Sequence, residues 1–166
     1  MRQRIALLLV ALSSALVIGC ASSRVMRDRP EFLFYWGEFG RNRIDTLSGT
    51  LVKDRIQEPP ALSFISLSAQ QRNQVVAWAD SLGFWEMPPH VAPPDTSFLR
   101  THSSSSGEYL LRLSVGRRTH TVYWSAEDAS TCEPCSRFKA LGGLIAGMVY
   151  STNTWKRMPE AKGFYQ

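Results

Sequence analysis

Two cysteines separated by two residues, Cys132 and Cys135, have the types and the spacing for redox chemistry. They precede a segment with helical periodicity, and a thiolate at the start of a helix has a lowered pKa and attacks disulfides. Such a pair can instead close a local disulfide that only stabilises the fold in an oxidising compartment. The residues after this helix predict none of the further strands of a thioredoxin-like fold. We therefore interpret the pair as a structural disulfide and keep a thiol–disulfide oxidoreductase as the alternative.

Other chemistry would need groups that the sequence does not place beside these cysteines. Haem attachment requires a histidine directly after the second cysteine, where the chain has Ser136. Zinc would need two more ligands, and the three histidines are scattered along the chain at His90, His102 and His120. No Gly-x-Ser-x-Gly motif marks a serine nucleophile. The sequence therefore predicts no cofactor, no metal site and no catalytic residue.

The third cysteine, Cys20, follows an apolar N-terminal run. Arg2 and Arg4 precede residues 5–18, which are apolar except for two serines. A basic start, a short apolar run and a small residue before a cleavage point describe an export signal. The run is shorter than the roughly 20 residues of a spanning helix. We therefore expect residues 1–19 to be removed on export.

The residues Val17-Ile18-Gly19-Cys20 resemble the lipobox of bacterial lipoproteins. The resemblance implies cleavage after Gly19, a diacylglyceryl group on the Cys20 thiol and a fatty acyl chain, such as palmitate, on the new amino terminus. Stable anchoring needs at least two buried chains, which this modification would supply. The implied partner is the lipid bilayer. In a host with two membranes, Ala21 would direct the protein to the outer membrane, facing the periplasm.

Composition separates a tether from a single domain after Cys20. Residues 20–30 are polar and lack periodicity, and fully extended they would reach about 30 Å. Residues 31–166 are expected to form one α+β domain. Without Arg2 and Arg4 the chain has 17 basic and 14 acidic residues, a formal charge of +3. This mild excess suits anionic head groups or polymers, and no basic helix or stacking motif indicates nucleic acid.

β-prone and alternating segments predict about four to five strands. They lie in residues 31–39, in a meander over 43–54, in 61–67 and in a hairpin of 109–115 with 119–124. Pro59 and Pro60 are expected to end the meander, and proline-rich residues 87–107 are expected to be a loop.

Two amphipathic helices complete the expected fold. Ser68 and Gln71 form a capping box at the start of the first, whose buried stripe is Val75, Trp78, Ala79 and Leu82, with Arg72 off the stripe. The second spans residues 136–151, and its apolar face is Phe138, Leu141, Leu144, Ile145, Met148 and Val149. Its glycines would let it approach a sheet closely. The sequence predicts an antiparallel sheet with both helices packed on one face.

Several segments of the mature chain carry a second resemblance. They are "DTLSGTLVKD", "LSAQQRNQVVAWADSLGFWEMP", "HTVYW" and "WKRMPEAKGFYQ". They are similar to segments of a loose family of uncharacterised bacterial lipoproteins and secreted domains, in which the last of them reads Leu-Pro-x-Ala-x-Gly-Gly-Tyr. Met158 and Phe164 depart from that pattern. The resemblance implies an exported domain and supplies no activity.

The functional hypothesis follows from the anchor signal. We expect a membrane-anchored lipoprotein whose domain is a non-catalytic binding or structural module of the cell envelope, with an envelope protein or polymer as partner. A cluster of aromatic residues allows either a stacking surface for a glycan or peptide, or a core with cross-strand pairs. These residues are Phe34, Tyr35, Trp36, Trp85, Tyr123 and Trp124.

Overall fold

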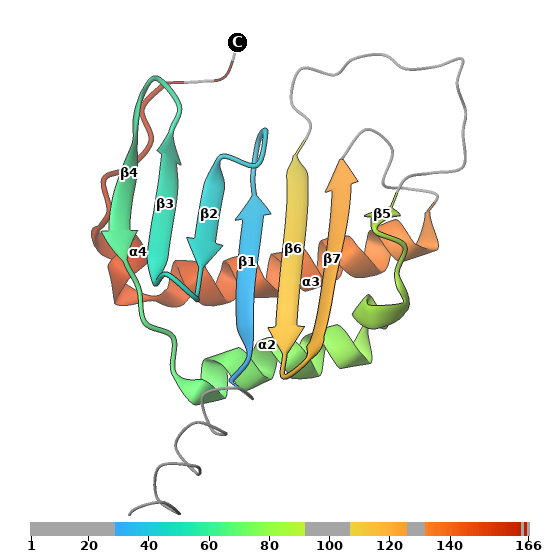
Figure 1. Ribbon diagram of the computed structural model, residues 1–166. Coiled ribbons are helices and arrows are strands. Elements are labelled where there is room, and N and C mark those ends of the chain that lie inside the picture. The colour runs from blue at the N-terminus through green and yellow to red at the C-terminus, as the bar shows by residue number, and fades with distance from the viewer. Residues whose placement is uncertain (1–28, 92–106, 126–131, 164, 166) are drawn as a thin grey trace, which may run out of the picture.

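A seven-stranded mixed sheet forms the centre of this computed structural model, which describes residues 29–91, 107–125, 132–163 and 165 (Figure 1). The strands are β1 (Glu31–Trp36), β2 (Asn42–Asp45), β3 (Thr50–Arg55), β4 (Glu58–Phe64), β5 (His90–Val91), β6 (Glu108–Val115) and β7 (Arg118–Ser125). They lie in the order β4-β3-β2-β1-β6-β7-β5. Neighbours are antiparallel except β5 and β7, which are parallel.

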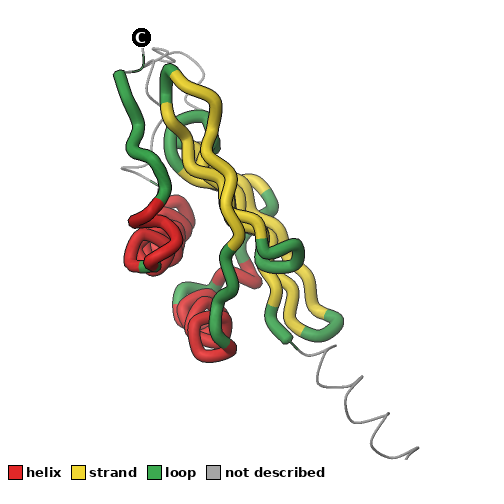
Figure 2. Tube along the Cα trace, turned by 90° about the vertical axis from the view of Figure 1, so that its left-hand side faces the viewer, coloured by secondary structure: helices red, strands yellow, loops and turns green. Residues whose placement is uncertain are grey.

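The helices lie on one face of this sheet and leave the other face open (Figure 2). They are α2 (Ala69–Ser81), the short 3₁₀ helix η1 (Phe84–Glu86), α3 (Glu133–Ser151) and α4 (Asn153–Arg157). Within the described ranges, none of the helices has the length and apolar character to cross a bilayer. The arrangement of the sheet and helices confirms the α+β class and the packing of the helices on one face.

The sheet itself is larger than expected, and it is mixed rather than antiparallel. β4 begins at Glu58 and includes Pro59 and Pro60, which were expected to end the meander. Proline is compatible with an edge strand because no neighbouring strand lies along the free edge to bond with the missing N–H. β5 lies in the predicted loop and pairs through His90 and Val91 with β7. Two residues show no periodicity, so only tertiary placement could reveal this strand.

The core lies between the sheet and the helices, and β1 shows how alternation builds it. Phe32, Phe34 and Trp36 are buried, whereas the residues between them are half-buried on the open face. The rings of Phe34 and Trp36 stack with centroids 5.2 Å apart, as do those of Tyr109 and Trp124. Stacked aromatic pairs at this spacing add to the free energy of burial.

Local signals place both ends of α2 as predicted. The Ser68 hydroxyl accepts the Gln71 N–H at 3.1 Å, and the Gln71 side chain accepts the Ser68 N–H at 2.9 Å. Gly83 follows α2 with φ of 66°, a left-handed conformation that suits glycine. Helix α3 begins at Glu133, earlier than expected, and Leu144 on its predicted apolar face is 42% exposed.

Candidate functional site

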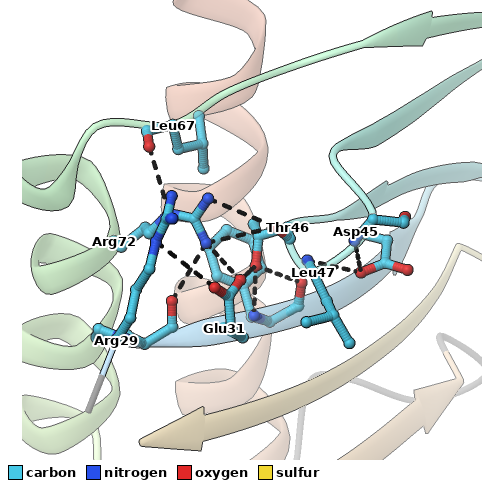
Figure 3. Close-up of polar contacts among 10 residues, drawn as sticks. Arg29, Glu31, Asp45, Thr46, Leu47, Leu67 and Arg72 are labelled. Carbon is cyan, nitrogen blue, oxygen red and sulfur yellow. Dashed lines mark hydrogen bonds and ion pairs between the residues drawn. The ribbon is translucent and has the colours of Figure 1, made fainter. Parts of the chain in front are cut away.

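A buried guanidinium, that of Arg72 on α2, lies where the chain enters the first strand (Figure 3). It forms an ion pair with the Glu31 carboxylate. Arg72 Nε donates to the Leu67 carbonyl at 3.3 Å, Nη1 to the Pro30 carbonyl at 3.3 Å, and Nη2 to the Thr46 carbonyl at 3.4 Å. One side chain therefore joins the start of β1, the β2–β3 turn and α2.

Arg72 was expected off the buried stripe of α2, and this expectation is wrong. Only 3% of the residue is exposed. It precedes the buried residues Val75 and Ala79 by three and seven positions, so it shares their helical face. The spacing from Val75 and Ala79 places Arg72 on the buried face of α2. A guanidinium without partners is too costly to bury, and this cost favoured an exposed position. The partners that make burial tolerable come from β1 and the β2–β3 turn, which only the tertiary fold brings close.

The Thr46 hydroxyl extends this cluster to the backbone of β1. It donates to the Glu31 carboxylate at 2.7 Å and accepts the Phe32 N–H, also at 2.7 Å. Thr46 is itself buried. The result is a satisfied polar network, which holds its members in one arrangement because every buried charge has a partner.

A shallow hollow of about 280 Å³ lies on the open face beside this cluster. Its lining residues are Glu31, Phe32, Leu33, Asp45, Leu47, Arg112, Ser114 and Thr119. Burial by itself would raise the pKa of Asp45, but hydrogen bonds from Ser48 and Leu47 and the charge of Arg112 hold this pKa below its ordinary value. A carboxylate with a lowered pKa is ionised at neutral pH, so Asp45 gives this hollow a negative charge beside the positive charge of Arg112.

The cysteine pair lies at the start of α3. The two sulfur atoms are at disulfide distance, and the Cα atoms are 5.0 Å apart. Cys132 is the N-cap residue, and its sulfur accepts the Cys135 N–H at 3.3 Å. Cys135 is fully buried and Cys132 is 8% exposed. Both cysteines are therefore largely shielded from solvent.

The structure divides the aromatic residues between the core and the open face. Phe34, Trp36 and Trp124 are buried, so they do not form a stacking surface. Tyr35 and Tyr123 are half-buried on the open face. The centroids of the His90 and Tyr123 rings are 5.4 Å apart. The guanidinium carbon of Arg118 lies 4.1 Å from the centroid of the Trp85 ring. The core interpretation therefore holds for the largest side chains.

Other predicted residues are dispersed or lie outside the described ranges. The Nε2 atom of His120 on β7 lies 2.9 Å from the Met87 carbonyl oxygen. Cys20, the signal over 1–19 and His102 fall outside the described residues. In the described part of the chain, no three His, Cys, Asp or Glu side chains gather as a metal site would require.

The chain was compared with protein-family models, with curated proteins and with solved structures. No family model, curated protein or solved structure matches it.

Proposed function

We propose that the chain is a membrane-anchored lipoprotein whose domain is a non-catalytic binding module of the cell envelope. The observation that carries this proposal is Val17-Ile18-Gly19-Cys20 at the end of a short apolar run. Acylation of Cys20 would place the domain beside a bilayer, and Ala21 favours the outer membrane of a host with two membranes.

The entry of the chain into the domain supports this attachment. Pro30, the last residue of the proposed tether, and Glu31, the first residue of β1, are bound directly by the buried Arg72. A domain held by its N-terminal end needs that end fastened to its core, since a loosely held first strand would fray. The Arg72 cluster supplies such a fastening.

The open face of the sheet supports a binding role. The helices of the described residues cover one face of the sheet (Figure 2), and the other face presents apolar side chains at its β4 end. Leu62 is 65% exposed and Phe64 is 76% exposed. Neighbouring exposed apolar side chains are a feature of interaction surfaces.

Metabolic labelling with a clickable palmitate analogue tests the anchor. We expect the wild-type chain to be labelled, to begin at residue 20 by mass spectrometry and to fractionate with membranes. Cys20→Ala should abolish labelling because it removes the acylated thiol. The matched control is the double variant Cys132→Ala/Cys135→Ala, which should remain labelled. An unlabelled wild-type chain with an intact N-terminus would refute the proposal.

A thiol–disulfide oxidoreductase is the second candidate function. It is favoured by Cys132 at the N-terminus of α3, where the helix dipole stabilises a thiolate. The double variant of the labelling experiment tests it as well. Reduction of a model disulfide by the wild-type chain, lost in that variant, would support the enzyme, and a pair that resists mild reductant would indicate a structural disulfide.

A further inference from the structure

The outer edge of β4 is an unpaired strand edge in the described part of the chain. β4 stands at one end of the strand order, with β3 on its inner side. The Ile65 N–H donates to the Gly49 carbonyl at 2.8 Å, which identifies the residues whose backbone faces β3. Hydrogen-bonded positions alternate along an antiparallel strand. Leu62 and Phe64 therefore direct their N–H and C=O groups outward.

One half of this edge is already protected. Pro59 and Pro60 have no N–H to offer a neighbouring strand. The C-terminal segment also lies beside the start of this half, because Lys162 Nζ is 3.3 Å from the Glu58 carboxylate and the Lys162 N–H donates to the Arg55 carbonyl at the end of β3, at 3.4 Å. Edge strands are usually blocked by such means.

The other half, residues 61–64, lacks this protection. Its sequence, Ala-Leu-Ser-Phe, contains neither proline nor charge. The side chains of Leu62 and Phe64 are exposed on the open face of the sheet. An apolar edge without charges is a ready template for an added strand.

Two hollows follow this edge on the side of the helices. One of about 350 Å³ lies between β4 and α4, and one of about 370 Å³ continues from it past Asn153 and Thr154. Arg157 supplies the one charge among the described residues that line them. No ion pair is formed by Arg157 with another described residue. The groove is therefore polar and mildly cationic.

We propose that residues 61–64 accept an extended segment of an envelope partner as an eighth strand. Its backbone pairs with the outward groups of Leu62 and Phe64. One set of alternate side chains is apolar and packs beside Leu62 and Phe64, and the other is acidic and enters the groove toward Arg157. This inference specifies the binding role proposed above, and it rests on that proposal for placing the partner in the envelope and for the membrane anchor that disfavours a second copy.

A second copy of the chain fits this edge less well. Antiparallel pairing of two β4 strands would turn one copy upside down, so that the two β1 entry points would leave from opposite ends (Figure 1). Two copies anchored in one membrane would then strain one tether. A partner segment with acidic side chains also complements Arg157, whereas a second copy adds another arginine.

The probe is a capped heptapeptide that alternates valine with glutamate, compared with one that alternates valine with lysine. Both are titrated by NMR into the full mature chain in detergent micelles, so binding is measured whether or not Cys20 is acylated. We expect amide exchange at Leu62 and Phe64 to slow at least tenfold. Exchange at Ala61 and Ser63 should not change, because their N–H groups already face β3. The glutamate peptide should bind about tenfold more tightly than the lysine peptide.

Two variants separate the backbone contribution from the charge contribution. Leu62→Pro removes one outward N–H and should abolish binding. Arg157→Gln leaves β4 intact and should abolish the preference for glutamate over lysine. Leu144→Thr, which changes an exposed leucine on α3, is the matched control and should bind as the wild type does.

Three results would overturn the proposal. They are the absence of saturable binding by the glutamate peptide, slowed exchange at amides away from β4, and concentration-dependent protection of Leu62 and Phe64 without peptide. The last result would assign the edge to a second copy of the chain. None of them bears on the acylation of Cys20, which the labelling experiment tests separately.

Discussion

At the scale of single residues, two buried cations hold the two ends of the described chain. Arg72 binds Glu31 and the Pro30 carbonyl at the start of β1. Lys53 on β3 donates to the Glu160 carboxylate at 2.9 Å and lies 5.0 Å from the centroid of the Trp155 ring. Each cation is only a few per cent exposed, so each needs its partners to offset the cost of desolvation. Both termini of the domain are therefore attached through charge rather than through apolar packing alone.

Replacement of Arg72 by methionine should destabilise the domain strongly. The change keeps the apolar stem but removes the Arg72 donor from three backbone carbonyls and from Glu31. Among the described residues, Glu31 then keeps only the Thr46 hydroxyl and the more distant Arg29 as partners. Because Glu31 is about a quarter exposed, we expect the free energy of unfolding to fall by about 3 kcal/mol, the lower end for a broken buried pair. Urea denaturation measures this.

Arg118→Met is the control for that measurement. Arg118 pairs with Glu86 at 3.4 Å, and both side chains are more than half exposed. An exposed pair contributes at most about 1 kcal/mol. Equal effects of the two substitutions would show that the Arg72 cluster does not fasten the N-terminal end.

At the scale of secondary-structure elements, the position of α3 depends on one of its three glycines. A Cβ atom on Gly142 would lie 3.1 Å from Tyr109 Cδ1 and 3.4 Å from Phe34 Cζ, whereas Gly143 and Gly147 face open space. The predicted close approach of this helix to a sheet is therefore confirmed at Gly142. The other two glycines lower helix propensity without a packing reason.

Alanine substitutions should have opposite effects at these positions. Gly142→Ala overpacks the contact with Tyr109 and should destabilise the domain by about 1–3 kcal/mol. In Gly147→Ala the added methyl group has no neighbour within 4 Å, so the higher helix propensity of alanine should stabilise the domain by up to about 1 kcal/mol. Thermal unfolding of both variants checks this. A stabilised Gly142→Ala variant would mean that α3 can move away from the sheet at little cost.

At the scale of the whole molecule, a row of aromatic side chains joins the sheet to α3 and α4. Trp155 and Tyr150 contact Trp36, which stacks on Phe34. Phe34 in turn stacks with Tyr109 at 5.9 Å between centroids. Burial raises the pKa of Tyr109, and the nearby Tyr150 raises it further. Ionisation of this one phenol therefore opposes folding of the whole domain.

The stability of the domain should fall at alkaline pH through Tyr109. Its pKa is raised in the folded state, so the unfolded chain loses the phenol proton first, at about pH 10. Below that pH the contribution of Tyr109 is constant, and above it stability falls until the folded pKa is passed. Tyr109→Phe should reduce this fall, as measured by urea denaturation from pH 8 to 11. Parallel pH profiles for the wild type and Tyr109→Phe would show that Tyr109 does not cause the loss of stability at alkaline pH.

Short-range patterns were sufficient to predict much of the fold and part of the candidate sites. The capping box at Ser68, the turn at Gly83 and the β6–β7 hairpin depend on neighbouring residues, so the sequence by itself determined them. The Cys132–Cys135 pair and the lipobox-like residues ending at Cys20 are likewise local motifs, and acylation of Cys20 stays a prediction. These features need no knowledge of what packs against them.

Long-range contacts decided the rest. The burial of Arg72 depends on acceptors from Pro30, Glu31 and Thr46. The strand β5 exists only because β7 lies beside it, and the exposed edge of β4 follows from its place at the end of the sheet. The free energy of a buried charge or a strand edge depends on partners distant in the sequence, and only the tertiary structure brings those partners together.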